Sequence, residues 1–228
     1  MRIGINIPKA SILEEVCEHC LYSGQYKLPS TNTASKASNI LELIHTDICG
    51  PMNYLSLGGA KYFIIFIDDK TRMTFIYLLK TKGEAFDKFK NFQALVENQQ
   101  NKKIKRIRSD NRGEFTSKKF KQHLQDCGIQ HETIVPYTCQ QNRVSERSNR
   151  TIVERAKSML YASGLGYEFW GEVVTTIVYL KNRSSTTAII GKTPYEAWFG
   201  KKPSLNYLKI FRYIVYAYIP KKKRYKLD

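Results

Sequence analysis

The chain has 228 residues, and its 37 lysines and arginines outnumber its 20 aspartates and glutamates, giving a formal net charge of +17. The hydrophobic fraction of 42% is that of an ordinary globular protein and argues against a disordered chain. So large a positive charge favours a polyanion such as nucleic acid as the partner, the alternative being a basic protein that its charge keeps soluble.

The amino-terminal residues, 1–39, show only a weak pattern of secondary structure. They end in a stretch rich in Ser, Thr, Asn and Ala over 30–39, a composition typical of a linker. We therefore place the end of an amino-terminal module at residue 39 and expect the folded core to begin at Ile40.

Three strands are expected at the start of the core, because apolar, β-branched and aromatic residues dominate these segments and Gly, Pro and Asp separate them. Short links favour antiparallel neighbours, so the three strands are expected to form a meander. They cover residues 40–48, 61–68 and 72–80.

After the meander, helices and strands alternate. Phe86, Phe89 and Phe92 recur at helical spacing, and Gly128 is expected to end a later helix. A helix between two strands can carry the chain across a sheet, which permits parallel strands. The expected elements are a helix at 83–98, a strand at 104–109, a helix at 117–126 and a strand at 129–135.

The rest of the chain is predicted to be mainly helical, with a polar loop before the first helix and a Thr-Pro start to the last. Alternating Tyr and aliphatic residues near the end suit strands. The expected elements are a loop at 136–143, helices at 144–163, 167–182 and 193–199, and strands within 205–219.

This succession indicates an α/β fold: a five-stranded mixed sheet, with three antiparallel strands followed by two parallel ones, flanked by helices. We assign residues 40–185 to the core. Residues 186–228 are expected to form a helical and short β extension with a basic tail.

Two aspartates lie near the carboxyl ends of strands that are expected to be parallel neighbours. Asp47 lies near the end of the first strand and Asp110 follows the fourth. Parallel neighbours end on the same side of a sheet, so the two carboxylates are predicted to share a site. Asp68 and Asp69 end the second strand, which runs the other way, so we expect them on the opposite side in a turn.

Glu146 follows the polar loop and opens the long helix. Alone, a carboxylate in a first helical turn is often only a partner of the helix dipole. Together with Asp47 and Asp110 it gives three hard oxygen ligands, which suit Mg²⁺ or Mn²⁺ rather than Zn²⁺. Two such ions roughly 3.5–4 Å apart can activate an attacking oxygen and stabilise the leaving oxygen of a phosphodiester.

Five segments stand out together: HTDICGPM (45–52), FIIFIDDKTR (63–72), RSDNRGEF (108–115), VPYTCQQNRVSERSNRTIVE (135–154) and GKTPYEAWFGKKP (191–203). In this order they resemble the integrase region of copia-type retrotransposon Pol polyproteins, part of the wider retroviral-integrase group with an RNase H-like fold. The resemblance extends from about Cys17 to Asp228. The family's pattern is Asp, Asp, then Glu after thirty-five residues, and thirty-five residues separate Asp110 from Glu146.

The resemblance implies that Asp47, Asp110 and Glu146 bind two Mg²⁺ or Mn²⁺ ions and catalyse 3′-end processing of element DNA, followed by strand transfer into target DNA. It also implies DNA and further copies of the chain as partners. Residues in the loop and helix that resemble the family's active-site loop are candidates for DNA contact, although cations on a helix are as often only solvated. They are Gln140, Gln141, Asn142, Arg143, Arg147, Arg150 and Lys157.

The chain departs from the family's pattern at several positions. Arg112 replaces a Gly, which costs roughly 1–2 kcal/mol if that position needs a positive φ. Arg143 replaces a Gly in the loop, and Ser148 stands where a Met is common. These departures favour an alternative, in which the chain is a truncated or domesticated remnant that binds nucleic acid without catalysis. A ribonuclease acting on RNA–DNA hybrids shares the fold and ranks last, because no fourth carboxylate is placed for that role.

Cys17 and Cys20 resemble the second half of the family's amino-terminal His-His-Cys-Cys zinc module. The spaced His pair is absent upstream and structural zinc normally takes four ligands, so we expect residues 1–39 to be a remnant that does not hold zinc alone. The five cysteines are odd in number and unevenly spaced, which argues against a secreted disulfide framework.

The sequence shows neither the pattern of a signal peptide nor an apolar run of membrane-spanning length. We expect an intracellular chain without a membrane partner, in a cytoplasmic particle or in the nucleus. The basic run PKKKR (220–224) is of the nuclear-localisation type, and its alternative role is a solvated edge that contacts phosphate.

Overall fold

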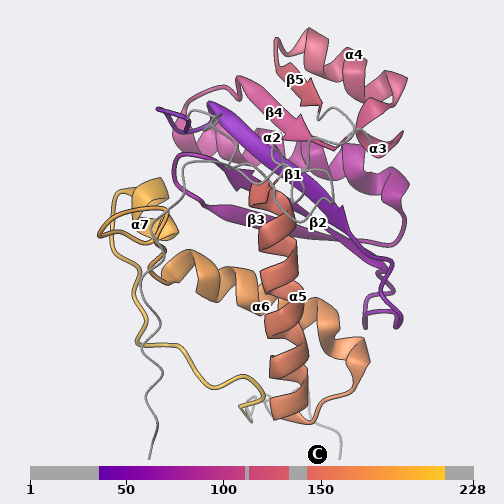
Figure 1. Cartoon of the computed structure of the whole chain (residues 1–228), viewed down its shortest axis with the longest axis vertical. Coiled ribbons are helices and arrows are strands. Elements are labelled where there is room, and N and C mark those ends of the chain that lie inside the picture. Colours follow the sequence, from indigo (N-terminus) through magenta and orange to yellow (C-terminus); the bar gives the residue numbers. More distant parts are fainter. Residues whose placement is uncertain (1–35, 111–112, 134–142, 214–228) are drawn as a thin grey trace, which may run out of the picture. The chain divides into compact units, whose positions relative to one another are not determined.

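The computed structural model describes residues 36–110, 113–133 and 143–213 (Figure 1). Contacts within the chain divide it into two units, Met1–Ser35 and Lys36–Asp228, and every described residue belongs to the second. The predictions for Cys17 and Cys20 therefore concern residues outside the described part.

The second unit contains a five-stranded sheet with the order β3-β2-β1-β4-β5. β1 pairs antiparallel with β2 and parallel with β4; β2 pairs antiparallel with β3, and β4 parallel with β5. This confirms the prediction of three antiparallel strands followed by two parallel ones. The strands are β1 (Leu43–Cys49), β2 (Tyr62–Asp68), β3 (Thr74–Leu79), β4 (Arg106–Ser109) and β5 (Gln130–Thr133).

Helices connect and follow these strands. A long helix, α2, carries the chain from β3 to β4, and α3 and α4 carry it from β4 to β5, so both connections are long enough for a parallel crossover. The 3₁₀ helix η1 (Lys82–Glu84) precedes α2 (Ala85–Gln100), and α3 (Gly113–Thr116) precedes α4 (Lys118–Asp126). After β5 come α5 (Arg143–Ser163), the 3₁₀ helix η2 (Tyr167–Phe169), α6 (Trp170–Arg183) and α7 (Pro194–Phe199).

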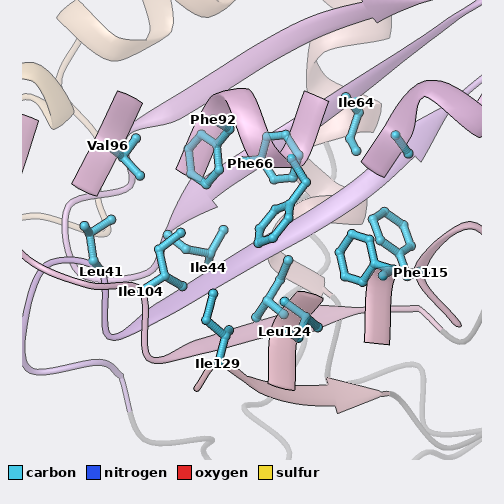
Figure 2. Packing of buried hydrophobic residues seen from close by; sticks show 14 of the residues in the cluster. Leu41, Ile44, Ile64, Phe66, Phe92, Val96, Ile104, Phe115, Leu124 and Ile129 are labelled. Atoms are coloured by element: carbon cyan, nitrogen blue, oxygen red, sulfur yellow. The ribbon is translucent and has the colours of Figure 1, made fainter. Parts of the chain in front are cut away.

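Side chains that alternate along the strands build two cores, one on each face of the sheet. On one face Ile44 and Phe66 pack with Phe92 of α2 and with α4 (Figure 2), and the rings of Phe66 and Phe92 stack with centroids 4.4 Å apart. On the other face Phe63, Ile65 and Ile67 pack against apolar residues of α5 and α6. Burying each large apolar side chain stabilises the fold by about 1.5–3 kcal/mol, so the two cores hold α2 and α5 against opposite faces.

The ends of two helices agree with their sequence signals. Gly128 follows α4 with a left-handed φ of 67°, a conformation that glycine adopts without strain. Thr193 caps α7 by accepting a hydrogen bond from the Glu196 amide, the Glu196 side chain accepts one from the Thr193 amide, and Pro194 occupies the first turn.

Two elements differ from the prediction. The short helix α3 was not expected, because Gly113 begins it and only four residues form it. The predicted carboxy-terminal strands are wrong over the described residues 205–213, which form turns closed by the Leu208 and Tyr213 amides. An alternating pattern forms a strand only when a neighbouring strand accepts its hydrogen bonds, and here Ile210 stays 86% exposed. Residues 214–219 lie outside the described part.

Among the described residues, none of the helices combines the length and the apolar character that crossing a membrane requires.

Candidate active site

Asp47 lies in β1, and Asp110 directly follows β4, the parallel neighbour of β1. Leu43, Ile44 and His45 of β1 pair with Arg106, Ile107 and Arg108 of β4. Asp47 lies two residues after His45 and Asp110 two residues after Arg108, just past the end of β4, so continuing the same register brings their backbones level. Neighbouring strands lie about 4.8 Å apart, and the prediction from strand direction that both aspartates lie on one side of the sheet is consistent with this register.

Both aspartates belong to the face of the sheet that α5 covers. Successive side chains of a strand point to opposite faces, and Ile44 and Ile107 belong to the core under α2. Asp47 therefore points the other way, and the same alternation, continued one residue past the end of β4, gives Asp110 this direction. The half-buried Asp47 carboxylate confirms this direction, since its Oδ2 accepts a hydrogen bond of 2.9 Å from Nδ2 of Asn149 in α5.

Asn149 links the helix to the strand. It is buried, and its Oδ1 has no hydrogen-bond partner among the described residues, although a buried amide oxygen normally has one. The Asp47 Oδ1 accepts a hydrogen bond of 2.9 Å from the Ile48 amide. The Asp47 carboxylate thus accepts hydrogen bonds from the Asn149 side chain and the Ile48 amide. The Asn149 Oδ1 beside it can still accept a hydrogen bond or bind a cation.

Glu146 lies on α5 one turn before Asn149, and its side chain is exposed. Residues three apart are neighbours on a helix surface, so Glu146 lies on the flank of α5 next to Asn149. Among the described residues, however, no three His, Cys, Asp or Glu side chains are grouped so that they could hold a metal ion together. The structure brings Asp47 level with Asp110, and it does not group the three carboxylates.

Comparison with known proteins adds a second line of evidence. Residues 38–139 match the model of the integrase core domain. The chain is 45% identical over 212 residues, 93% of its length, to a retrovirus-related Pol polyprotein from transposon TNT 1-94 of Nicotiana tabacum. It is 34% identical over 213 residues to the Pol polyprotein from transposon RE2 of Arabidopsis thaliana.

Residues 38–139 belong to the integrase core domain family.

The relatives are much longer than this chain, which covers 16% of the tobacco polyprotein and 14% of the Arabidopsis one. The matched integrase core segment includes Asp47 and Asp110 and ends before Glu146. The family likeness of Glu146 therefore rests on its spacing from Asp110 and on the longer polyprotein matches.

Solved structures of integrases share the fold. The catalytic core domain of HTLV-2 integrase, in complex with magnesium in a trimeric form, matches with a TM-score of 0.51 at 17% identity and covers 69% of this chain and 95% of that one. A chain of the simian T-cell lymphotropic virus intasome in complex with PP2A regulatory subunit B56 gamma matches with a TM-score of 0.56 at 15% identity, covering 78% and 60%. The fold is that of retroviral integrase catalytic cores, the expected RNase H-like fold.

The candidate DNA-contacting residues of the integrase core separate into two groups on α5. Arg150 and Lys157 are exposed and lie four and eleven residues after Glu146, on the same flank of the helix. Arg147 lies on the other flank and lines a cavity against α6. Gln140, Gln141, Asn142 and Arg112 lie outside the described residues, as does the side chain of Arg143.

Sequence reasoning missed a group of charges on β4 and β5. Arg106 and Arg108 share the face of Asp110, and both bind Glu132, through contacts of 2.7 Å and 2.6 Å. Partial burial raises the pKa of Glu132, but the two guanidinium groups outweigh it and leave that pKa below its usual value. The alternation in IKRIRS (104–109) was the available signal, because it places Arg106, Arg108 and Asp110 on one face.

Asp68 and Asp69 hold the opposite end of the sheet together, where the strand directions predicted them. Asp68 accepts hydrogen bonds from the Leu41 and Thr71 amides, and Asp69 accepts one from the Ala37 amide. Asp69 also contacts His45 at 3.0 Å and Arg72 at 2.9 Å. Asp68 ends β2 and Asp69 begins the turn after it, as predicted, and both belong to a buried hydrogen-bond network.

The residues at the Asp47 edge fit a divalent cation in kind. Carboxylate and amide oxygens are the ligands that Mg²⁺ prefers, and the unpartnered Oδ1 of Asn149 adds a buried acceptor beside Asp47. Asp47, Asp110 and Glu146 would hold the ions. Since the three carboxylates are not grouped in this structure, the Glu146 side chain would have to move toward the two aspartates, and a cation would offset their mutual repulsion.

Proposed function

We propose that this integrase core domain catalyses DNA strand transfer, in which a 3′-hydroxyl of element DNA attacks a phosphodiester of target DNA, after hydrolytic trimming of the element ends. The observation that carries the proposal is the parallel register that brings Asp47 and Asp110 level on the face under α5, with Asn149 bonded to Asp47. The integrase core match over 38–139 supports it.

In the proposed mechanism, the chain supplies ligands, position and charge. Asp47, Asp110 and Glu146 would hold two Mg²⁺ or Mn²⁺ ions, which when bound would activate the attacking oxygen and stabilise the leaving oxygen. Asn149 fixes the orientation of Asp47 through its 2.9 Å hydrogen bond. Arg150 and Lys157, which are exposed on the flank of Glu146, are the proposed contacts to DNA phosphates.

The test is a strand-transfer assay with Mg²⁺ or Mn²⁺ and a labelled duplex. We expect Asp110→Asn to reduce joined product by at least about 100-fold, because an amide is a much weaker ligand for a divalent cation. Asp126→Asn is the matched control, since Asp126 is an exposed aspartate at the end of α4, and it should retain full activity. Wild-type product levels with Asp110→Asn would refute the site.

A second candidate function is DNA binding without catalysis. It is favoured by the absence of a three-carboxylate group among the described residues and by Arg112 and Arg143 in place of glycines. The same assay separates the two, because a silent remnant would bind the duplex and yield no joined product with either metal.

We also propose that the chain acts as a homo-oligomer on DNA. One solved neighbour is described as an intasome and the other as a trimeric form, which supports the proposal. Light scattering of the chain with and without duplex DNA tests it, and a strictly monomeric complex at saturating DNA would contradict it.

A further inference from the structure

A cavity of about 490 Å³ lies on the flank of α5 that faces away from Glu146. One wall is a stripe of α5 at helical spacing, and the others come from the β2–β3 turn, the end of α6 and the residues after it. Three cations and several hydroxyl groups line it, including Arg72, Arg147, Ser148, Thr151, Lys181 and Thr186.

Lys181 is the central group of this cavity. Its Nζ donates to Ser148 Oγ at 2.5 Å and to Thr74 Oγ1 at 3.2 Å. An ammonium group has three hydrogens to donate, so one is left for a ligand. In the described part of the chain, Lys181 forms no ion pair with a carboxylate.

The other two cations leave the cavity with an excess of positive charge. Arg147 has neither an ion pair nor a hydrogen bond among the described residues. Arg72 forms an ion pair with Asp69, whose carboxylate also accepts hydrogen bonds from His45 and the Ala37 amide. The Nε of Arg72 is buried without a partner in the described part. Arg72 also has a left-handed φ of 57°, which is unfavourable for a residue other than glycine.

A partly buried lysine without a counter-charge is costly unless it loses its proton or gains an anion. Burial lowers the pKa of Lys181 to about 8, and the charges of Arg155 and Arg72 act in the same direction. An anion between Lys181 and Arg147 would raise the pKa of Lys181 again, because it favours the charged ammonium. The Thr151 and Thr186 hydroxyls can donate hydrogen bonds to the oxygens of such an anion.

We propose that this cavity binds a phosphate group, with Lys181 and Arg147 as its charged partners and the surrounding hydroxyls as additional donors. The site lies on the opposite flank of α5 from Glu146 and Arg150, so it is separate from the proposed catalytic site. Two sources could supply the phosphate: a free phosphate or diphosphate ion, or the backbone of a nucleic acid.

The first experiment measures thermal unfolding of the full chain in sodium phosphate and in sodium diphosphate, against sodium chloride at equal ionic strength and without divalent metal. We expect the phosphate buffers to raise the Tm of the wild type above its value in chloride. Lys181→Met and Arg147→Gln should lose this increase, with phosphate affinity at least roughly tenfold weaker. Lys119→Gln, which changes an exposed lysine of α4, should keep it.

The variants also separate binding from a structural role. Lys181→Met removes a partly buried charge together with its hydrogen bonds to Ser148 and Thr74, so the Tm of each variant in phosphate is compared with its own Tm in chloride, whereas Arg147 is exposed and its loss should leave the fold unchanged. An equal phosphate effect in the wild type and both variants, or no phosphate effect in the wild type, would overturn the proposal.

The second experiment titrates a labelled duplex into the same variants. If nucleic acid supplies the phosphate, both variants bind the duplex more weakly than Lys119→Gln, and free phosphate competes with the duplex in the wild type. If free phosphate is the ligand, duplex affinity is equal in all three variants while the Tm response still differs. Neither experiment requires strand transfer, so failure of this proposal and failure of the proposed catalysis are distinguishable.

Discussion

At the scale of single residues, Asn149 decides how the Asp47 carboxylate is held. Its Nδ2 donates to Asp47 Oδ2, while its Oδ1 is buried without a partner in the described part. The residue joins a helix and a strand that are about a hundred residues apart in the chain. Asn149 is thus a positioning residue for Asp47, a metal ligand of the proposed mechanism.

We predict that Asn149→Ala lowers strand transfer by roughly 10–100-fold, because ligand orientation is lost. The Mg²⁺ concentration for half-maximal activity should rise, an effect that a purely structural role would not produce. Asn98→Ala, at an exposed position of α2, is the control. An unchanged Mg²⁺ dependence in Asn149→Ala would remove Asn149 from the site.

Asp69 is the second residue whose surroundings make a prediction. Burial raises its pKa, but hydrogen bonds from His45 and the Ala37 amide and the charge of Arg72 outweigh this and lower the pKa to about 2. The pKa in the folded chain is thus below the ordinary value of 3.8. The resulting stabilisation is complete above about pH 4 and is lost as the pH falls toward 2.

We predict that Asp69→Asn lowers the free energy of unfolding by about 3–5 kcal/mol at pH 7, because Arg72 loses its partner. The variant should also show a smaller loss of stability than the wild type between pH 4 and pH 2. Urea denaturation at several pH values measures both effects. Parallel pH profiles for the two proteins would show that Asp69 does not carry the acid sensitivity.

At the scale of elements, local signals fixed the helix ends. The predicted Thr-Pro start of α7 is part of a capping box of Thr193 and Glu196, and the left-handed Gly200 ends the helix. Tertiary contacts then hold this short helix, since Trp198 is buried, donates to Gln99 Oε1 at 3.2 Å and packs edge-on against Phe75. A six-residue helix needs both kinds of support, because isolated short helices are unstable in water.

We predict that Thr193→Ala lowers the free energy of unfolding by about 1 kcal/mol, because the Glu196 amide loses its acceptor. For a chain of this size that corresponds to a fall in Tm of about 2–4 °C. Ser204→Ala, at an exposed position beyond α7, should leave the Tm unchanged. Equal Tm values for the two variants would show that the cap does not contribute.

At the scale of the whole molecule, the net charge of +17 is the dominant property. Acidic side chains neutralise the positive charge in some places and not in others. Arg106 and Arg108 form ion pairs with Glu132, whereas Arg150 and Lys157 are exposed on α5. Counterion release from DNA should therefore dominate affinity for nucleic acid.

We predict a steep salt dependence of duplex binding. With about six phosphate contacts, affinity should fall roughly 10³-fold between 50 and 200 mM salt. Fluorescence anisotropy with a labelled duplex measures the slope of log affinity against log salt concentration. Arg150→Gln should reduce this slope by about the contribution of one phosphate contact. A flat salt dependence would mean that the charge does not serve DNA binding.

The sequence by itself determined the order of the elements, the strand directions and the positions of Asp47 and Asp110. These follow from hydrophobic periodicity and from the lengths of the links between strands, which are local properties. It did not determine the turns at 205–213, because a strand requires a partner that the pattern does not contain.

Only the tertiary structure decided which flank of α5 faces which neighbour. It placed Asn149 against Asp47, and it placed Arg147 beside the cavity of Lys181. It also left Glu146 ungrouped with the two aspartates. The rotation of a helix about its axis is set by packing against strands and helices distant in the chain, so residues on one predicted helix can serve two separate sites.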